Sequence, residues 1–283
     1  MAPADSRGFR PQHSNMRTIS RRAAQSRCFV SSLLTLVAVV ACAHHAAPVA
    51  SVVPGLALTM KVSRSPDTIV YRRSVTRAAR DSITGTRTVV MRVVSDESRT
   101  RLLQVEQRFP GGGGTIVDTA VAELQSARAV GHRSHQPTRT MVFDFAANEA
   151  TGTVTVTPAS RDSMPRVENV RQNVGGPIFD SNIIEIVIAA LPLAPNFTSE
   201  LPFFIYERGG RVPMRVAVQE RASVPFPLLG AREAWLVSVD VPGAPAMVWV
   251  DTRTHDVLRV RYDVRAQGIA FTDDRTTPLS KRG

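Results

Sequence analysis

Apolar side chains recur at every second position through most of this sequence, and this period constrains its fold more than any other feature. In the segment 258–264, apolar and charged side chains take turns: Leu258, Arg259, Val260, Arg261, Tyr262, Asp263 and Val264. Successive side chains of a β-strand point to opposite faces of a sheet, so this pattern predicts strands with one dry and one wet face. We therefore expect a mainly β protein with an antiparallel sheet.

Turn-forming residues separate further segments with the same period. In the first half we expect strands at 68–76, 86–94, 101–109, 115–123, 138–145 and 151–157. In the second half we expect them at 203–206, 212–219, 235–241, 247–250 and 258–264. This gives about ten to twelve strands in a single β-rich domain over residues 55–272. The glycine run at 111–114 predicts a hairpin loop, 161–176 predicts a long loop, and 273–283 predicts a polar tail.

One segment departs from the two-residue period. Asp180 opens a helix-start signal, and the run from Ile183 to Leu191 that follows is almost wholly apolar and ends at Pro192. Glu185 is the only charge within the run. A helix that is apolar on nearly all sides must be covered by other elements. We expect one short helix inside a strongly curved half-barrel; a buried strand is the alternative for so β-branched a run.

The first 42 residues resemble a secretory signal peptide. Six arginines and one acidic residue precede an apolar run from Phe29 to Ala41, which is too short for a comfortable membrane span. The stretch Val39–Cys42 resembles a bacterial lipobox, which predicts that Cys42 becomes the lipidated first residue of a periplasmic protein. Ala43 follows the cysteine in place of aspartate, and this points to the outer membrane. Cleavage after Ala43 and an uncleaved anchor are the alternatives.

Charge and composition limit the kinds of partner that the chain is expected to bind. Residues 43–54 are rich in Ala, Val and Pro and predict a flexible tether between an anchor and the domain. The 35 basic residues include only two lysines, Lys61 and Lys281, and they form no dense cluster with interleaved aromatic residues. We therefore expect no nucleic-acid partner.

Motifs for common catalytic chemistry do not occur in the sequence. It lacks G-x-S-x-G, H-E-x-x-H, C-x-x-C and G-x-G-x-x-G, so we expect no catalytic residue, metal site or cofactor. His132 and His135 would face opposite sides of a strand, and we expect them to be exposed in a loop rather than to bind a metal. A hydrolase would have to build its site from residues such as Asp118, Asp144 and His132.

The sequence holds more large apolar side chains than a thin sheet needs. We expect some of them to line a cavity for an acyl chain or a similar ligand, because partly closed barrels hold such molecules. An ordinary filled core is the alternative. The candidate lining residues are Phe143, Phe145, Phe179, Ile183, Ile184, Val187, Ile188, Leu191, Phe203, Trp235 and Trp249.

Two parts of the sequence resemble known exported bacterial proteins. The segments 230–237, 248–254 and 257–259 are similar to the final strands of periplasmic lipoprotein carriers of the LolA/LolB type, in which a Trp-x-Asp-x-x-Thr hairpin precedes a Leu-Arg strand. Trp249, Asp251 and Thr254 match that hairpin. The segments 177–180 and 190–193 resemble an uncharacterised DUF family of exported proteins with the same half-barrel.

The resemblance covers residues 115–270 and implies a strongly curved antiparallel sheet, wrapped on a helix, with a hydrophobic inner face. Together with the signal peptide, it predicts an exported, lipid-anchored envelope protein. The expected ligand is a lipid or the acyl chain of a lipoprotein, bound without catalysis. A structural or assembly factor of the envelope with a filled core, and a periplasmic hydrolase, are the alternatives.

Overall fold

The computed structural model describes residues 50–51, 58, 62, 65–111, 113–158, 164–208 and 210–279. The chain forms two units, residues 1–46 and 47–283, and every described residue belongs to the second. The predicted signal peptide with Cys42, and nearly all of the predicted tether, lie outside the described residues. Among the residues described, no helix is long and apolar enough to cross a membrane.

One sheet holds all the strands of the described part of the chain. The strands are β1 (Ala50–Ser51), β2 (Asp67–Arg77), β3 (Arg80–Ser95), β4 (Arg101–Gly111), β5 (Gly114–Glu123), β6 (Ala129–Gln136), β7 (Arg139–Phe145), β8 (Glu149–Val156), β9 (Arg166–Asn173), β10 (Phe179–Asp180), β11 (Thr198–Ile205), β12 (Gly210–Phe226), β13 (Gly230–Val239), β14 (Ala246–Asp251), β15 (Val257–Val264) and β16 (Ile269–Arg275). Short 3-10 turns occur at η1 (Ser181–Ile183), η2 (Tyr206–Arg208) and η3 (Arg265–Gln267), and the one described α-helix is α1 (Ile184–Ala190).

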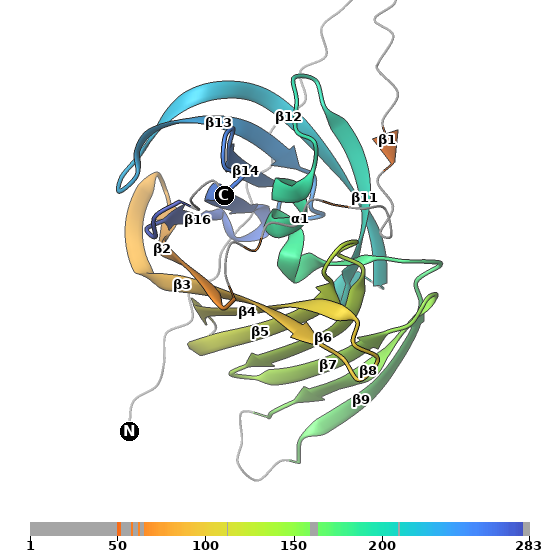
Figure 1. Cartoon of the computed structure of the whole chain (residues 1–283). Helices are drawn as coiled ribbons and strands as arrows, with labels where there is room; N and C mark the ends of the chain where they lie inside the picture. Colours follow the sequence, from red (N-terminus) through yellow and green to blue (C-terminus); the bar gives the residue numbers. More distant parts are fainter. Residues whose placement is uncertain are drawn as a thin grey trace, which may run out of the picture. The chain divides into compact units, whose positions relative to one another are not determined.

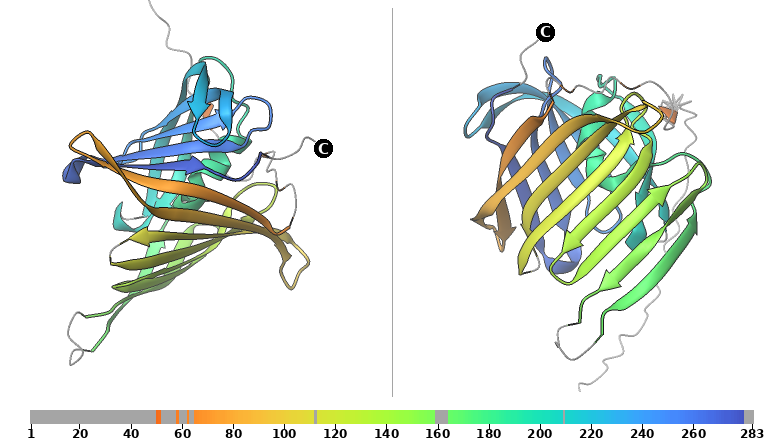
Figure 2. Two further views of the ribbon diagram at one scale, coloured as in Figure 1. Left: turned by 90° about the vertical axis from the view of Figure 1, so that its left-hand side faces the viewer. Right: turned by 60° about the horizontal axis from the view of Figure 1, so that its bottom comes forward.

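The strand order shows where the curved sheet is continuous and where it is open. From β11 to β16 and from β2 to β9 each strand pairs antiparallel with the next, and β16 pairs with β2 to join the two series. The short strands β1 and β10 pair with β11 in parallel. Within the described residues no ladder joins β9 to β11, so the sheet stays open there. Figures 1 and 2 show the strands curving around α1. The predicted fold class, a half-barrel around one short helix, is confirmed.

The connection between the two edges of the sheet places the helix inside it. After β9 the chain returns to β11 through residues 174–197, and this connection carries β10, η1 and α1 (Figure 1). Asp180 caps η1, because its side chain accepts a hydrogen bond from the Asn182 backbone N–H at 2.9 Å. Leu191 is extended and ends α1 just before Pro192. The predicted start and end of the helix agree with this geometry.

The main hydrophobic core surrounds α1. Val187 and Ile188 are fully buried in it, together with residues of β2–β5 and β11–β15 such as Leu103, Leu201 and Val260. A second cluster lies under β6–β9 and a third under the hairpin of β12 and β13. The two larger clusters bury apolar side chains from most of the strands, as expected for strands with one dry face.

Besides the two-residue strands β1 and β10, three strands form where the sequence pattern did not predict them. The segment 161–176, expected to be a loop, contains β9, an edge strand whose side chains are mostly exposed and in which only Val170 is buried. Such polar edge strands carry no apolar alternation. Strand β6 contains His132, which is buried and not exposed as expected. Strand β16 extends past the expected boundary at 272, because Asp273 and Arg275 are buried in ion pairs.

Candidate functional site

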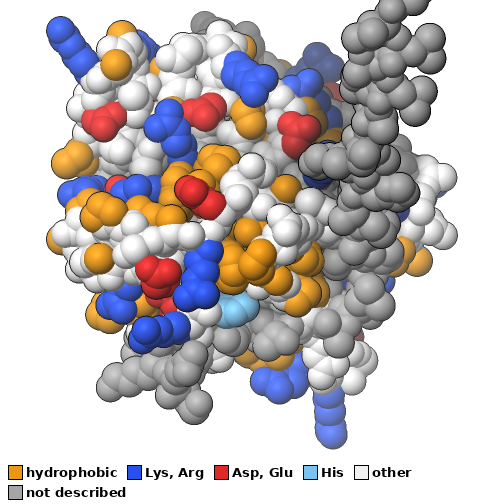
Figure 3. All heavy atoms as spheres, turned by 90° about the horizontal axis from the view of Figure 1, so that it is seen from above, with side chains coloured by type: hydrophobic (Ala, Val, Ile, Leu, Met, Phe, Trp, Pro, Cys, Tyr) orange, Lys and Arg blue, Asp and Glu red, His pale blue; other side chains and the backbone are white. Residues whose placement is uncertain are grey.

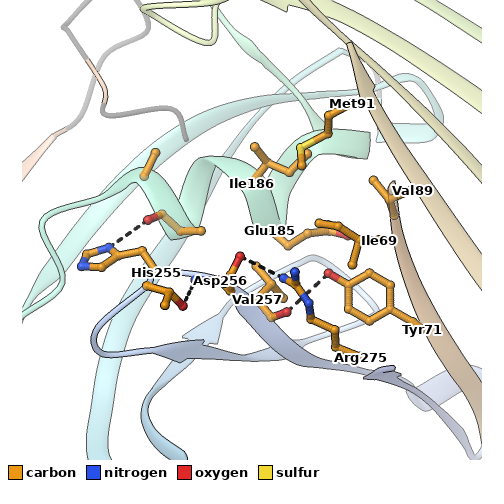
Figure 4. A pocket seen from close by; sticks show the side chains of 13 residues that line it. Ile69, Tyr71, Val89, Met91, Glu185, Ile186, His255, Asp256, Val257 and Arg275 are labelled. Carbon is orange, nitrogen blue, oxygen red and sulfur yellow. Dashed lines mark hydrogen bonds and ion pairs between the residues drawn. The ribbon is translucent and has the colours of Figure 1, made fainter. Parts of the chain in front are cut away.

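Three cavities lined by described residues lie beside the helix α1 or the turn η1. The first, here the Tyr71 cavity, lies between α1 and strands β2, β3 and β15 (Figure 4). Ile69, Met91 and Ile186 line its apolar side. Its volume is about 50 Å³, which is room for one or two water molecules and not for an alkyl chain.

Polar groups at the base of the Tyr71 cavity already have partners. Arg275 forms an ion pair with Asp256 at 3.0 Å, and the Tyr71 hydroxyl lies 3.5 Å from the carbonyl oxygen of Val257 (Figure 4). The His255 ring lies 3.1 Å from the Ala189 carbonyl oxygen. Burial raises the pKa of Tyr71, so its hydroxyl stays neutral and can donate. We interpret this cavity as part of the scaffold that holds α1 against the sheet.

A larger cavity, here the interior cavity, opens on another side of η1 and α1. Its volume is about 300 Å³, which is the lower end of the range of small-molecule sites, and it is open at one side. Six side chains from β4, α1, β11, β12, β15 and the segment after β13 give it apolar or aromatic walls: Phe109, Ile184, Ile205, Met214, Val241 and Tyr262. It is large enough and apolar enough to take hydrocarbon.

A buried ionic network lines the wall of the interior cavity formed by β2, β3 and α1. Arg73 donates two hydrogen bonds to Asp273, at 2.8 and 2.7 Å. Arg87 forms ion pairs with Glu185 of α1 and with Asp273, and donates to Gln107 at 2.8 Å. Both arginines therefore already have carboxylate partners, and this wall offers no unpaired cation to a ligand.

The third cavity, here the His132 cavity, is smaller and polar. Its volume is about 150 Å³, and strands β5, β6 and β7, turn η1 and the end of β11 enclose it. His132 Nδ1 lies 2.9 Å from Asp180 Oδ2 and 3.1 Å from the Asn182 side-chain amide. Its other polar lining residues are Ser134, Gln136, Arg139, Ser181 and Tyr206, together with Asp118.

Asp118 marks the junction of the two larger cavities. Asp118, Ser181 and Asn182 line both the interior cavity and the His132 cavity. The Asp118 side chain is 7% exposed, and its Oδ1 has no hydrogen-bond partner among the described residues. Burial raises the pKa of this carboxyl group, and a hydrogen bond from Ser134 opposes the shift. A polar compartment and an apolar compartment thus meet at one buried carboxyl group.

The predicted lining residues are mostly part of the packed core. Phe179, Phe203, Trp235 and the five residues of the helical segment belong to the main cluster around α1, while Phe143 and Phe145 pack with Phe204 in the second cluster. Trp249 is half-buried against the third cluster. Of the eleven predicted residues, Ile184 lines the interior cavity and Phe143 lines the His132 cavity.

Residues that the sequence analysis did not single out form most of the cavity walls. Met214 and Ile205 lie on β12 and β11, and their apolar alternation alone did not distinguish lining from core. Seen from above, apolar side chains gather on this face of the molecule between single acidic and basic side chains (Figure 3). Apolar groups are thus not confined to the core, although exposed apolar surface is common in proteins.

Of the residues suggested for a hydrolase, Asp118 and His132 line the same cavity, but Asp144 does not join them. Asp118 faces the interior, whereas Asp144 is exposed on β7 between two buried phenylalanines and so points to the opposite face. His135 is exposed and lies 3.3 Å from the Thr140 hydroxyl. Over the part of the chain that the structure describes, no group of three or more His, Cys, Asp or Glu residues could hold a metal ion.

Comparison with known families identifies the chain. A profile of the family described as "Protein of unknown function (DUF3108)" matches residues 69–272. The chain belongs to the DUF3108 family. In this DUF3108 chain, every residue that lines the interior cavity or the His132 cavity lies within the matched range. Membership of an uncharacterised family is thus confirmed, while the finer likeness to LolA/LolB carriers stays a prediction.

Two further comparisons add little to the DUF3108 assignment. No curated protein matches the chain. Among solved structures, the crystal structure of a DUF1329 family protein from Desulfovibrio piger is similar, with 10% identity over 78% of this chain and 88% of that chain and a TM-score of 0.26. A likeness of this size supports no inference about function.

Proposed function

We propose that this protein is an exported, lipid-anchored envelope protein whose half-barrel binds a hydrophobic ligand without transforming it. The ligand class is a lipid or the acyl chain of a lipoprotein. The interior cavity is the observation that carries this proposal, because it is an apolar space of about 300 Å³, open at one side, within a half-barrel.

The chemistry of the walls favours hydrocarbon. Phe109, Ile205, Met214 and Val241 present aliphatic or aromatic surface on several sides, and burying apolar surface contributes about 25 cal/mol per Å². Arg73 and Arg87 are paired with carboxylates, so hydrocarbon entering the cavity leaves neither guanidinium group without a partner. The size suits a single alkyl chain or another small apolar molecule rather than a bulky ligand.

Binding without catalysis fits the arrangement of the polar groups. Asp118 and Asp144 lie on opposite faces of the sheet, so they cannot act as a pair on one bond. Export and anchoring rest on the sequence, in which the lipobox-like stretch Val39–Cys42 follows a short apolar run. A lipid-anchored module would keep such a cavity close to a source of acyl chains.

A cavity-filling substitution tests this proposal. Val241 is half-buried and lines the interior cavity, so Val241→Trp places an indole where the ligand would lie. Purified full-length wild-type protein is expected to retain about one lipid per chain in native mass spectrometry and to bind the apolar dye N-phenyl-1-naphthylamine. Val241→Trp should weaken dye binding at least about tenfold, which corresponds to about 1.4 kcal/mol.

Val117→Trp is the matched control. Val117 is a half-buried valine on β5 next to Asp118, so it points to the opposite, outer face of the sheet. This variant should bind the dye as the wild type does. Equal dye binding by the two tryptophan variants, or a wild-type protein that holds neither lipid nor dye, would overturn the proposal. The second result would favour an envelope assembly factor, which the fully buried packing around α1 also suits.

A further inference from the structure

The ligand of the half-barrel can be specified further from the junction of its two larger cavities. Asp118 lies at this junction, more than nine-tenths buried, and its Oδ1 has no partner among the described residues. A buried acceptor without a partner is unfavourable by about 1 to 3 kcal/mol, and more when it is charged. Such groups are rare in folded proteins and call for an explanation.

The groups around Asp118 indicate which kind of ligand group could pair with its carboxylate. Ser134 on β6 supplies a hydrogen bond to the carboxyl group, and His132 and Arg139 lie near enough to act on it electrostatically. His132 is held by Asp180, and Arg139 donates to Gln136 at 3.0 Å. The Asp180 carboxylate adds a second negative charge to the same cavity. The surroundings therefore favour a donor of hydrogen bonds over an anion.

The opposite wall of the interior cavity leads to the same conclusion. Arg73 and Arg87 also line that space, and an anionic head group could be drawn to them. Both arginines are already paired, however, with Asp273 and Glu185. An anion would have to displace one of these buried carboxylates, which leaves an unpaired charge in the interior and is strongly unfavourable.

The shapes of the two cavities match the two ends of an amphiphile. The interior cavity is apolar over most of its walls, while the His132 cavity is lined largely by polar side chains. Asp118, Ser181 and Asn182 are common to both, so a molecule can lie in the first with its head at the second.

We propose that the ligand is an amphiphile whose head carries a hydrogen-bond donor, a primary ammonium or a hydroxyl group, and that the Asp118 carboxylate accepts from it. This inference rests on the proposed function. His132, held by Asp180, and Ser134 complete the polar compartment around the head group. The alkyl chain lies along Ile184, Met214 and Val241.

Displacement of N-phenyl-1-naphthylamine from the full-length protein tests the inference with three competitors that share one alkyl chain. Dodecylammonium, dodecanol and dodecanoate differ only in the head group. We expect one of the two donors to displace the dye at about tenfold lower concentration than dodecanoate, because a hydrogen bond to a charged group contributes about 1.5 to 3 kcal/mol. A preference for dodecylammonium identifies an ammonium head, and a preference for dodecanol a hydroxyl head.

Asp118→Asn should abolish this preference while the variant still binds the dye. Asp144→Asn makes the same change at an exposed position on β7 and should leave the preference intact. Equal displacement by all three competitors, a preference for dodecanoate, or a preference that survives Asp118→Asn would refute the inference while the proposed function stands. Failure of the wild type to bind the dye at all would remove both.

The stability of the Asp118→Asn variant shows whether a lost preference is caused by lost binding or by unfolding. Burial raises the pKa of Asp118 above its value in the unfolded chain, so ionisation of this group destabilises the folded state. That penalty develops as pH rises from the unfolded pKa, near 4, through the folded pKa, and it is fully present above both. Asp118→Asn is therefore expected to unfold at no lower urea concentration than the wild type at pH 7, so that lost preference reports on binding.

Discussion

At the scale of single residues, this half-barrel carries charged side chains in its interior as well as on its surface. Arg87 is 3% exposed and Glu185 is 4% exposed, and they pair across the boundary between α1 and β3. Arg73 and Asp273 pair on the same inner face of the sheet. In alternating strands such residues would be expected on the wet face, and they are tolerated inside because each finds a partner of opposite charge.

Removing one member of this network should be much more damaging than removing an exposed ion pair. Glu185→Ala leaves Arg87 buried with the neutral Gln107 and a longer contact to the Asp273 carboxylate at 3.4 Å, so we expect a loss of about 3 to 5 kcal/mol in the free energy of unfolding. Glu149→Ala removes the exposed pair with Arg171 and should change it by less than about 1 kcal/mol. Urea denaturation followed by circular dichroism measures both, and similar losses would contradict this account.

At the scale of elements, close approach of strands β7 and β8 depends on a glycine. A side-chain Cβ at Gly152 would lie 1.9 Å from the Val142 carbonyl oxygen and 2.9 Å from the Phe143 Cα atom. Both are backbone atoms of β7, which cannot rotate away as a flexible side chain can. The bulky Phe143 ring of β7 occupies the space that the glycine leaves, and it packs edge-on against Phe204 at 5.2 Å.

Gly152→Ala should therefore separate β7 from β8 and lower stability by about 2 kcal/mol or more, in the range of overpacked sites. Gly131→Ala, on the other neighbour of β7, is the matched control, because the nearest atom to its Cβ is 3.7 Å away. We expect that variant to lie within about 1 kcal/mol of the wild type. Thermal unfolding of the two variants decides the point, and an equal effect at both glycines would count against so close an approach of β7 and β8.

At the scale of the whole molecule, the two ends of the sheet explain where the ligand site lies. The chain leaves the sheet at β9, crosses its interior through η1 and α1, and returns at β11. Arg211 on β12 donates hydrogen bonds to the carbonyl oxygens of Val174 and Gly175, which ties the start of this crossing to the other edge. The crossing covers the concave face but leaves the interior cavity beside it.

The proposed anchor gives a prediction at the same scale. Cys42→Ser removes the thiol that lipidation requires, so the protein should move from the membrane fraction to the soluble fraction, or stay uncleaved as the precursor. Wild-type protein should carry the mass of a diacylglyceryl group on a chain that begins at Cys42, since stable anchoring needs more than one acyl chain. A wild-type chain that begins after Ala43 without added mass would instead show ordinary cleavage.

The sequence by itself determined the local features of this protein. The two-residue period places β2–β5, β7, β8 and β11–β15, and the change of period at Ile183 together with the cap at Asp180 places the helix. These features can be predicted from the sequence because each strand with one buried face shows the two-residue period within its own segment. Strand β9 escaped detection because a polar edge strand has no dry face to impose the period.

Only the tertiary structure decided which polar groups became buried and where space remained. Arg73 and Asp273 are 200 positions apart, and their pairing follows from the β16–β2 ladder rather than from any local pattern. Asp118 likewise meets η1 only because the crossing segment folds back over β5. A period in sequence reports which face of a strand is dry, but a cavity and an ion pair depend on distances between strands that are far apart along the chain.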